Sequence, residues 1–142
     1  IRRPPRSTQS RSSAASDVYK RQFQEQAEDI KNNFLSFLIK TKNNGHSVVG
    51  YGAAAKGSTL LNFSGVRPDL LPYVVDKSDA KKDKFMPGSR VPIMSETQLK
   101  KDKPDYIVIF PWNIQDEVIE QLAYIREWGG KFVIFIPSMR VI

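Results

Sequence analysis

The chain has 142 residues, a formal net charge of +7, one histidine and no cysteine. This length suits one domain with a single buried core. Without cysteine there are no disulfides or thiolate metal sites, and one histidine argues against a zinc site, so we expect no metal site in this chain. No run of about 18 apolar residues predicts a membrane-spanning helix. We therefore expect a cytoplasmic protein with no membrane partner.

The positive charge is concentrated in residues 1–22, which contain six Lys or Arg and one acidic residue. Residues 23–142 keep 16 basic and 14 acidic groups, so the rest of the chain is nearly balanced. The segment lacks the interleaved aromatic residues of single-strand binders and the apolar run of a signal peptide. We expect a disordered tail that resembles translated adapter or vector sequence, and we predict no nucleic-acid partner.

The first predicted element is a helix that follows this tail and buries one face. Its apolar residues recur every three or four positions, at Phe23, Ala27, Ile30, Phe34 and Leu38. The stretch KTKNNGH ends the helix, because Asn-Asn-Gly is typical of a helix C-terminus.

Short apolar segments and helical segments then alternate. The predicted strands are SVVGYG, LPYVVDKS, VPIMS, PDYIVIFPW and KFVIFIP, and residues 77–90 are a predicted loop. The first predicted helix is AAAKGSTLLNFSG, which ends at Gly65. A short second helix begins with a capping box of Ser95 and Gln98. The third runs from Asn113 or Asp116 to Trp128, with an apolar stripe of Val118, Leu122 and Ile125. Strands that are apolar on both faces and alternate with helices predict a parallel sheet between helix layers. Residues 23–142 are therefore expected to form a Rossmann-like, three-layer α/β/α domain with a mostly parallel sheet of about five strands.

The stretch VGYGAAAKGSTLLN places glycines between a strand and a helix, which is typical of a phosphate-binding turn. The Walker A pattern fails, because Lys56 precedes Gly57 instead of following it. The dinucleotide fingerprint fits better: Gly50, Gly52 and Ala55 have its spacing, and Asp76 ends the next strand. In this interpretation Gly52 is a glycine because a ligand approaches its backbone. The alternative is that the glycines only permit a tight turn.

Four stretches in order resemble one family: VVGYGAAAKGSTLLNFSG, VVDKSDAKKDKFMPGSRVPI, KPDYIVIFPWN and YIREWGGKFVIFIP. They are similar to the C-terminal domain of three-domain S-adenosylmethionine-dependent C-methyltransferases, known for methylating nucleotide-linked sugars. The resemblance implies an N-terminal zinc-binding domain and a middle domain that holds S-adenosylmethionine, and we expect both to be missing from this chain. The fragment is then expected to be inactive alone. Its partners would be a nucleotide-sugar or related small molecule and the missing domains.

The candidate substrate-binding residues lie at the carboxyl edge of the predicted sheet. They are Gly50, Tyr51, Gly52, Ala53, Lys56, Ser58, Thr59 and Asn62 in the glycine turn, Asp76 and Lys77 after the second strand, and Pro111, Trp112 and Asn113 after the fourth. The N–H groups of residues 53–55 and Lys56 suit a phosphate, and Asp76 suits a sugar hydroxyl. Structural alternatives are a loop cap for Asp76, a helix N-cap for Asn113 and a backbone bond for Asn62. The resemblance also includes Phe85, Pro87, Gly88 and Arg90 in the site region.

Three functions fit these features. The first is the substrate-side domain of a C-methyltransferase, the second is a stand-alone nucleotide-binding module, and the third is part of an NAD-dependent oxidoreductase. No pair of base and nucleophile has the spacing of a catalytic dyad, so the catalytic residues are unknown. His46, at the opposite end of the first strand, is interpreted as structural.

Overall fold

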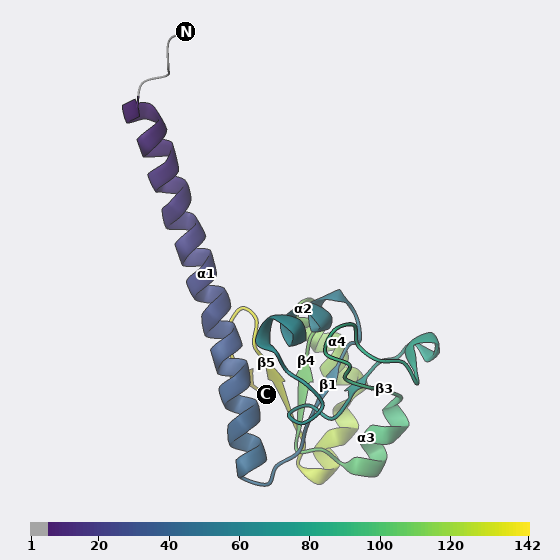
Figure 1. Cartoon of the computed structure of the whole chain (residues 1–142). Helices are drawn as coiled ribbons and strands as arrows, with labels where there is room; N and C mark the ends of the chain where they lie inside the picture. The colour runs from purple at the N-terminus through teal and green to yellow at the C-terminus, as the bar shows by residue number, and fades with distance from the viewer. Residues whose placement is uncertain (1–5) are drawn as a thin grey trace.

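A six-stranded sheet forms the centre of the computed structural model, which describes the backbone of residues 6–142 and the side chains of residues 15–142 (Figure 1). The strands are β1 (Val48–Tyr51), β2 (Val74–Val75), β3 (Ile93–Met94), β4 (Tyr106–Ile109), β5 (Lys131–Ile134) and β6 (Arg140–Val141). Their order is β3-β2-β1-β4-β5-β6, with β6 antiparallel and all other pairs parallel. The mostly parallel α/β fold predicted from the sequence is confirmed, with one strand more than expected.

The helices cover both faces of this sheet. They are α1 (Arg6–Asn43), α2 (Ala55–Ser64), α3 (Glu96–Asp102) and α4 (Gln115–Gln121), with 3-10 turns η1 (Asp79–Lys81), η2 (Trp112–Ile114) and η3 (Ala123–Trp128). Successive strand residues point to opposite faces. One core therefore packs α1 and α2 on Val48, Val74 and Val108, and the second packs α3, α4 and η3 on Val49, Val75 and Ile107. The expected three layers are present.

The elements end where the sequence predicts. Gly45 follows α1 with φ +77°, and His46 N–H donates to Thr41 O at 2.9 Å, which closes the last turn. Gly65 and Gly129 are also left-handed, after α2 and η3. The predicted capping box of α3 does not form, because Ser95 makes no side-chain cap bond and Gln98 Nε2 donates to Asp102 Oδ2 instead.

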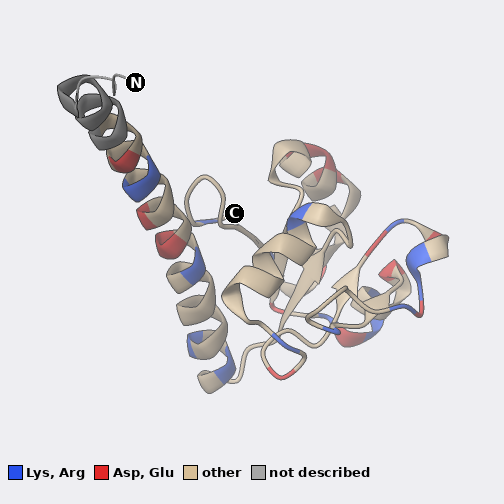
Figure 2. Ribbon diagram, turned by 45° about the horizontal axis from the view of Figure 1, so that its top comes forward, with Lys and Arg blue, Asp and Glu red and all other residues tan. Residues whose placement is uncertain are grey.

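Helix α1 is longer than predicted and its first half projects from the domain (Figure 1). It begins at Arg6, so residues 6–22 of the expected tail are helical, and residues 1–5 lie outside the described residues. Charged residues of both signs lie along this helix (Figure 2). The prediction that the whole apolar stripe is buried is wrong at its beginning: Phe34 is 0% exposed and Phe23 is 75% exposed. Among the described residues, no helix has the length and apolarity needed to cross a lipid bilayer.

Removing residues 1–22 should leave the melting temperature unchanged within error, because residues 15–22 are all exposed and bury little apolar area. Differential scanning calorimetry of the two chain lengths checks this. Phe34→Ala is the control in the same helix, and it should cost about 3–5 kcal/mol because its ring is fully buried. A marked fall on truncation would show that the segment packs onto the domain.

Candidate functional site

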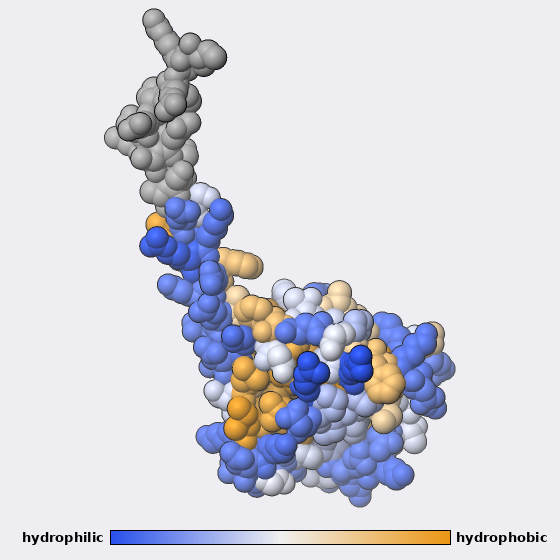
Figure 3. Space-filling model, viewed as in Figure 1, coloured by the Kyte–Doolittle hydropathy of each residue, from blue (hydrophilic) through white to orange (hydrophobic). Residues whose placement is uncertain are grey.

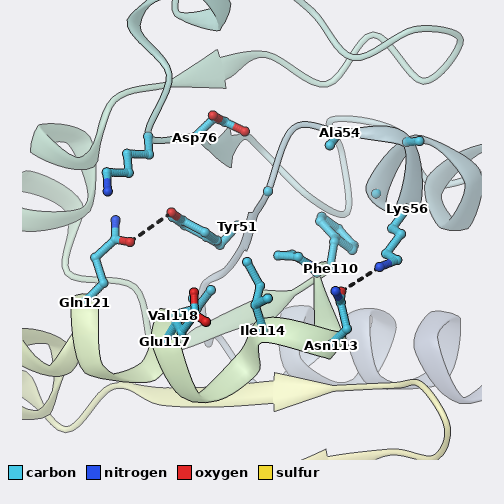
Figure 4. Close-up of a pocket in the computed structure, with 15 residues that line it drawn as sticks. Tyr51, Ala54, Lys56, Asp76, Phe110, Asn113, Ile114, Glu117, Val118 and Gln121 are labelled. Atoms are coloured by element: carbon cyan, nitrogen blue, oxygen red, sulfur yellow. Dashed lines mark hydrogen bonds between the residues drawn. The ribbon is translucent and has the colours of Figure 1, made fainter.

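A cavity of about 610 Å³ lies at the carboxyl ends of β1 and β4, where the strand order reverses direction. Open α/β sheets bind ligands at this topological switch point, and the volume falls in the range of small-molecule sites. The lining residues are Tyr51, Gly52, Ala54, Ala55, Lys56, Gly57, Asp76, Lys77, Phe110, Pro111, Asn113, Ile114, Glu117, Val118 and Gln121. The structure thus brings residues of the three predicted segments together around one cavity (Figure 4).

The floor of the cavity is a contact between the glycine turn and the end of β4. A Cβ atom on Gly50 would lie 2.5 Å from Phe110 Cε2, and one on Gly57 would lie 3.0 Å from Phe110 Cδ2. A Cβ atom on Gly52, whose φ is +104°, would lie 2.5 Å from Pro111 Cδ. These glycines let the Phe110 and Pro111 rings pack against the turn. The positive φ of Gly52 and its contact with Pro111 are sufficient reasons for a glycine there, as the tight-turn alternative expects, although Gly52 also lines the cavity.

The backbone donors of the turn are only partly available to a ligand. Gly52 N–H donates to Val75 O at 2.8 Å, and Ala53 N–H donates to Asp76 Oδ2 at 2.7 Å. Asp76 Oδ1 accepts from Ser78 N–H at 2.8 Å, so the carboxylate joins the glycine turn to the loop after β2. The loop-capping alternative for Asp76 is thus correct, although the side chain also lines the cavity. The N–H groups at the start of α2 lack intrahelical partners and face this edge.

Lys56 forms one side of the cavity, and its ammonium group reaches from α2 to η2. Its Nζ donates to Asn113 Oδ1 at 2.6 Å and lies 5.1 Å from the centre of the Trp112 ring. Asn113 is inside η2, which Pro111 precedes, so its predicted role as a helix N-cap is wrong. The contact joins two sequence motifs that are 57 residues apart. It leaves the ammonium group beside the cavity and exposed, where further hydrogen bonds are possible.

The other side is built by a chain of side-chain hydrogen bonds. Tyr51 OH donates to Gln121 Oε1 at 3.3 Å (Figure 4). Gln121 Nε2 donates in turn to Glu96 Oε2 at 3.1 Å. Tyr124 OH donates to the second oxygen of Glu96 at 2.9 Å. Burial raises the pKa of Tyr51, although its bond to Gln121 acts in the opposite direction. Burial and the bond to Glu96 also raise the pKa of Tyr124. Gln121 is therefore fixed in one amide orientation at the cavity wall.

Some predicted site residues lie elsewhere. Gly50 is under the Phe110 ring, Ala53 is buried, and Ser58, Thr59, Asn62 and Trp112 are outside the cavity lining. Asn62 Nδ2 donates to Pro87 O at 3.0 Å, as its backbone-bonding alternative expected. This bond holds the loop containing Phe85, Gly88 and Arg90 against α2, away from the cavity. His46 lies at the opposite end of the sheet, 3.5 Å from Asp105.

Six lining residues were not among the predicted site residues: Gly57, Phe110, Ile114, Glu117, Val118 and Gln121. A signal for two of them was present: Asn113, Glu117 and Gln121 recur every four residues, which places polar side chains on one side of a helix. Phe110, Ile114 and Val118 form the apolar base between the two polar sides (Figure 4). Apolar residues of this kind look like ordinary core in a sequence, and only the packing of the end of β4, η2 and α4 around the cavity makes them part of its lining.

Gly52→Ala should cost more stability than Gly129→Ala, although both positions have positive φ. A residue with a side chain loses about 1–3 kcal/mol to backbone strain at either position. At Gly52 the new Cβ atom also meets Pro111, whereas nothing lies within 4 Å at Gly129. Urea denaturation of both variants checks this, and equal losses would show that the Pro111 contact is unimportant.

The free energy of unfolding should fall as the pH rises above about 10, the usual pKa of tyrosine. A raised folded-state pKa means that the unfolded chain loses its phenolic protons first, so the stabilisation is complete below pH 10 and is lost above it. Tyr51→Phe and Tyr124→Phe should each make this fall shallower in urea denaturation between pH 8 and pH 11. Tyr19→Phe, on the exposed part of α1, is the control and should not change the slope.

Comparison with known proteins identifies the family of this chain. The family described as "C-methyltransferase C-terminal domain" matches residues 7–137, a range that starts within the segment expected to be a tail. The chain is 34% identical over 122 residues to C-methyltransferase NovU of Streptomyces niveus. That match covers 86% of this chain and 29% of NovU, so the chain spans less than a third of the relative's length. The chain belongs to the family of C-methyltransferase C-terminal domains.

Proposed function

We propose that this chain is the substrate-side domain of an S-adenosylmethionine-dependent C-methyltransferase, and that the β1–β4 cavity binds a nucleotide-linked sugar or a related small molecule. The observation that carries the proposal is the cavity itself, at the ligand-binding edge of a chain that belongs to this family. The methyl transfer then requires the rest of the enzyme, with which this domain forms one active protein.

The charges around the cavity suit a ligand with both phosphates and hydroxyls. Lys56 and Lys77 provide two ammonium groups, and the start of α2 adds its dipole to their attraction for a diphosphate. Asp76 and Glu117 provide carboxylates, which accept hydrogen bonds from sugar hydroxyls. The apolar base of Phe110, Ile114 and Val118 suits the flat or apolar parts of the ligand.

The same geometry argues against a dinucleotide and therefore against the oxidoreductase alternative. A pyrophosphate would approach the glycine turn at Gly52, where the Pro111 ring packs and the N–H already donates to Val75. We place the methyl donor in another domain of the enzyme, together with the zinc, as the family resemblance implies.

Isothermal titration calorimetry of this chain with a nucleotide-sugar, such as a thymidine diphosphate hexose, tests the proposal. The ligand should bind, and Lys56→Met should weaken its binding by roughly ten- to a hundredfold, since a hydrogen bond to a charged group contributes about 1.5–3 kcal/mol. Binding by the wild-type chain should weaken as salt is raised, and the variant should show a smaller salt dependence. S-adenosylmethionine should give no heat of binding.

Lys100→Met is the matched control, because Lys100 is an exposed lysine over the Tyr124 ring and outside the cavity. It removes the same charge and should leave the affinity unchanged. Equal weakening by both variants would mean that only the net charge matters. Absence of nucleotide-sugar binding, or tight binding of S-adenosylmethionine, would contradict the proposed function.

A further inference from the structure

The hydrogen bonds on one wall of the β1–β4 cavity fix which of its groups donate and which accept. An ionised carboxylate only accepts, so the bond of 3.1 Å to Glu96 requires the nitrogen of the Gln121 amide to point toward α3. The amide oxygen then faces Tyr51, and because a carbonyl oxygen only accepts, the Tyr51 hydroxyl is the donor at 3.3 Å. Tyr124 donates to the other oxygen of Glu96 at 2.9 Å and holds this carboxylate in place.

These bonds leave a defined set of hydrogen-bonding groups for a ligand. Tyr51 and Gln121 line the cavity (Figure 4), whereas Glu96 and Tyr124 are outside its lining. The Tyr51 oxygen keeps its lone pairs, the Gln121 oxygen keeps one lone pair, and the Gln121 nitrogen keeps one N–H. Because Tyr51 lies on the oxygen side of the amide, the order of free groups is acceptor, acceptor, donor. We call these groups the Tyr51–Gln121 wall.

Glu117 adds a further acceptor beside this wall, outside the plane of the Gln121 amide. It lines the same cavity and precedes Gln121 by four residues in α4. The two side chains therefore lie on one side of the helix, with their Cβ atoms roughly 5–6 Å apart. A flat ligand edge meets groups that share its plane, whereas the hydroxyls of a sugar ring point in different directions. The arrangement of Gln121 and Glu117 suits a ring with hydroxyls.

The order of donors and acceptors separates the possible ligand groups. A thymine or uracil ring has one N–H between two carbonyl oxygens, so its N–H at the Gln121 oxygen would place a carbonyl against the Tyr51 oxygen. Two hydroxyls on neighbouring carbons have no such conflict, because each one both donates and accepts. One hydroxyl can donate to Gln121 while its neighbour accepts from the amide N–H and donates to Glu117.

We propose that Gln121 and Glu117 bind two hydroxyls on neighbouring ring carbons of the ligand, and that this vicinal diol is what the Tyr51–Gln121 wall selects. The inference rests on the proposed function and adds the group recognised and the residues that recognise it. Glu96 is a positioning residue, because it acts by fixing the Gln121 amide. The phosphates of the same ligand lie on the opposite side of the cavity, at Lys56.

The test measures how much a vicinal diol adds to the affinity of the 142-residue chain. The ligands are uridine diphosphate, its 2′-deoxy form and the glucose esters of both. Titrations followed by saturation-transfer NMR, which detects weak binding, give a dissociation constant for each. A ribose diol makes uridine diphosphate bind roughly tenfold more tightly than its 2′-deoxy form, and a hexose diol makes the deoxy glucose ester bind more tightly than deoxyuridine diphosphate by a similar factor. We call this factor the diol ratio.

Substitutions in α4 connect the diol ratio to the two residues. Gln121→Leu should bring the ratio to about one, since leucine is of similar size and has no hydrogen-bonding group. Gln115→Leu is the matched control in the same helix, because Gln115 is outside the cavity lining and accepts from Arg140 at 3.2 Å. It should leave the ratio unchanged. Affinity for deoxyuridine diphosphate, which lacks both diols, should change less than twofold in either variant.

Two further variants keep the test independent of folding. Glu117 is exposed, so Glu117→Ala should keep the melting temperature and still lower the diol ratio severalfold, whereas Glu120→Ala, outside the lining, should not lower it. Glu96→Gln tests positioning, because an amide can donate or accept and lets the Gln121 amide turn over. The diol ratio should fall while the affinity for deoxyuridine diphosphate is kept.

Diol ratios near one for both sugars in the unaltered chain, or a ratio that survives Gln121→Leu, would overturn the inference. So would guanosine diphosphate that binds more tightly than uridine diphosphate and depends on Gln121, because guanine has two N–H donors beside a carbonyl and the wall would then read a base. Binding of deoxyuridine diphosphate that depends on Lys56, with diol ratios of one, rejects the diol alone. Absence of binding by every ligand rejects the proposed function and this inference with it.

Discussion

The packing of the Phe110 and Pro111 rings against Gly50, Gly52 and Gly57 is the contact on which the site depends. It joins the turn after β1 to the end of β4, the two neighbouring strands between which the chain changes direction in the sheet. Side chains at any of the three glycines would push these segments apart. Because the contact is close, α2 starts at a fixed distance from η2, and the Lys56 ammonium group reaches Asn113 and lies over the Trp112 ring.

The cavity is consequently formed before any ligand arrives. Asp76 bonds the backbone of both adjoining loops, Lys56 spans one side, and Tyr51, Gln121, Glu96 and Tyr124 form a connected chain on the other. Fixed polar groups of this kind lower the entropic cost of binding, because fewer side chains have to be ordered. Lys77, at the start of the loop between β2 and β3, adds its positive charge to the cavity lining.

Helix α1 packs on the domain along only part of its length. Its second half completes one core through Phe34 and Leu38, while its first half offers Phe23 to solvent. Apolar side chains gather where α1 meets the body of the domain (Figure 3). A groove of about 500 Å³, lined by Phe23 and Phe63, and the β1–β4 cavity meet at the start of α2, where Ala55 and Lys56 line both.

The sequence by itself determined the layers and the edge of the site. Period-two and helical apolar patterns identified every strand except β6, and the positions of Asp76 and Asn113 after parallel strands placed them at one edge. The tertiary structure decided what each residue does there. Gly52 packs against Pro111, and the Asp76 carboxylate accepts hydrogen bonds from the backbone of two loops. Asn113 accepts a hydrogen bond from Lys56, and the Phe23 side chain remains exposed. Local patterns specify which face of an element is apolar, whereas contacts between segments far apart in the chain depend on how those faces pack together.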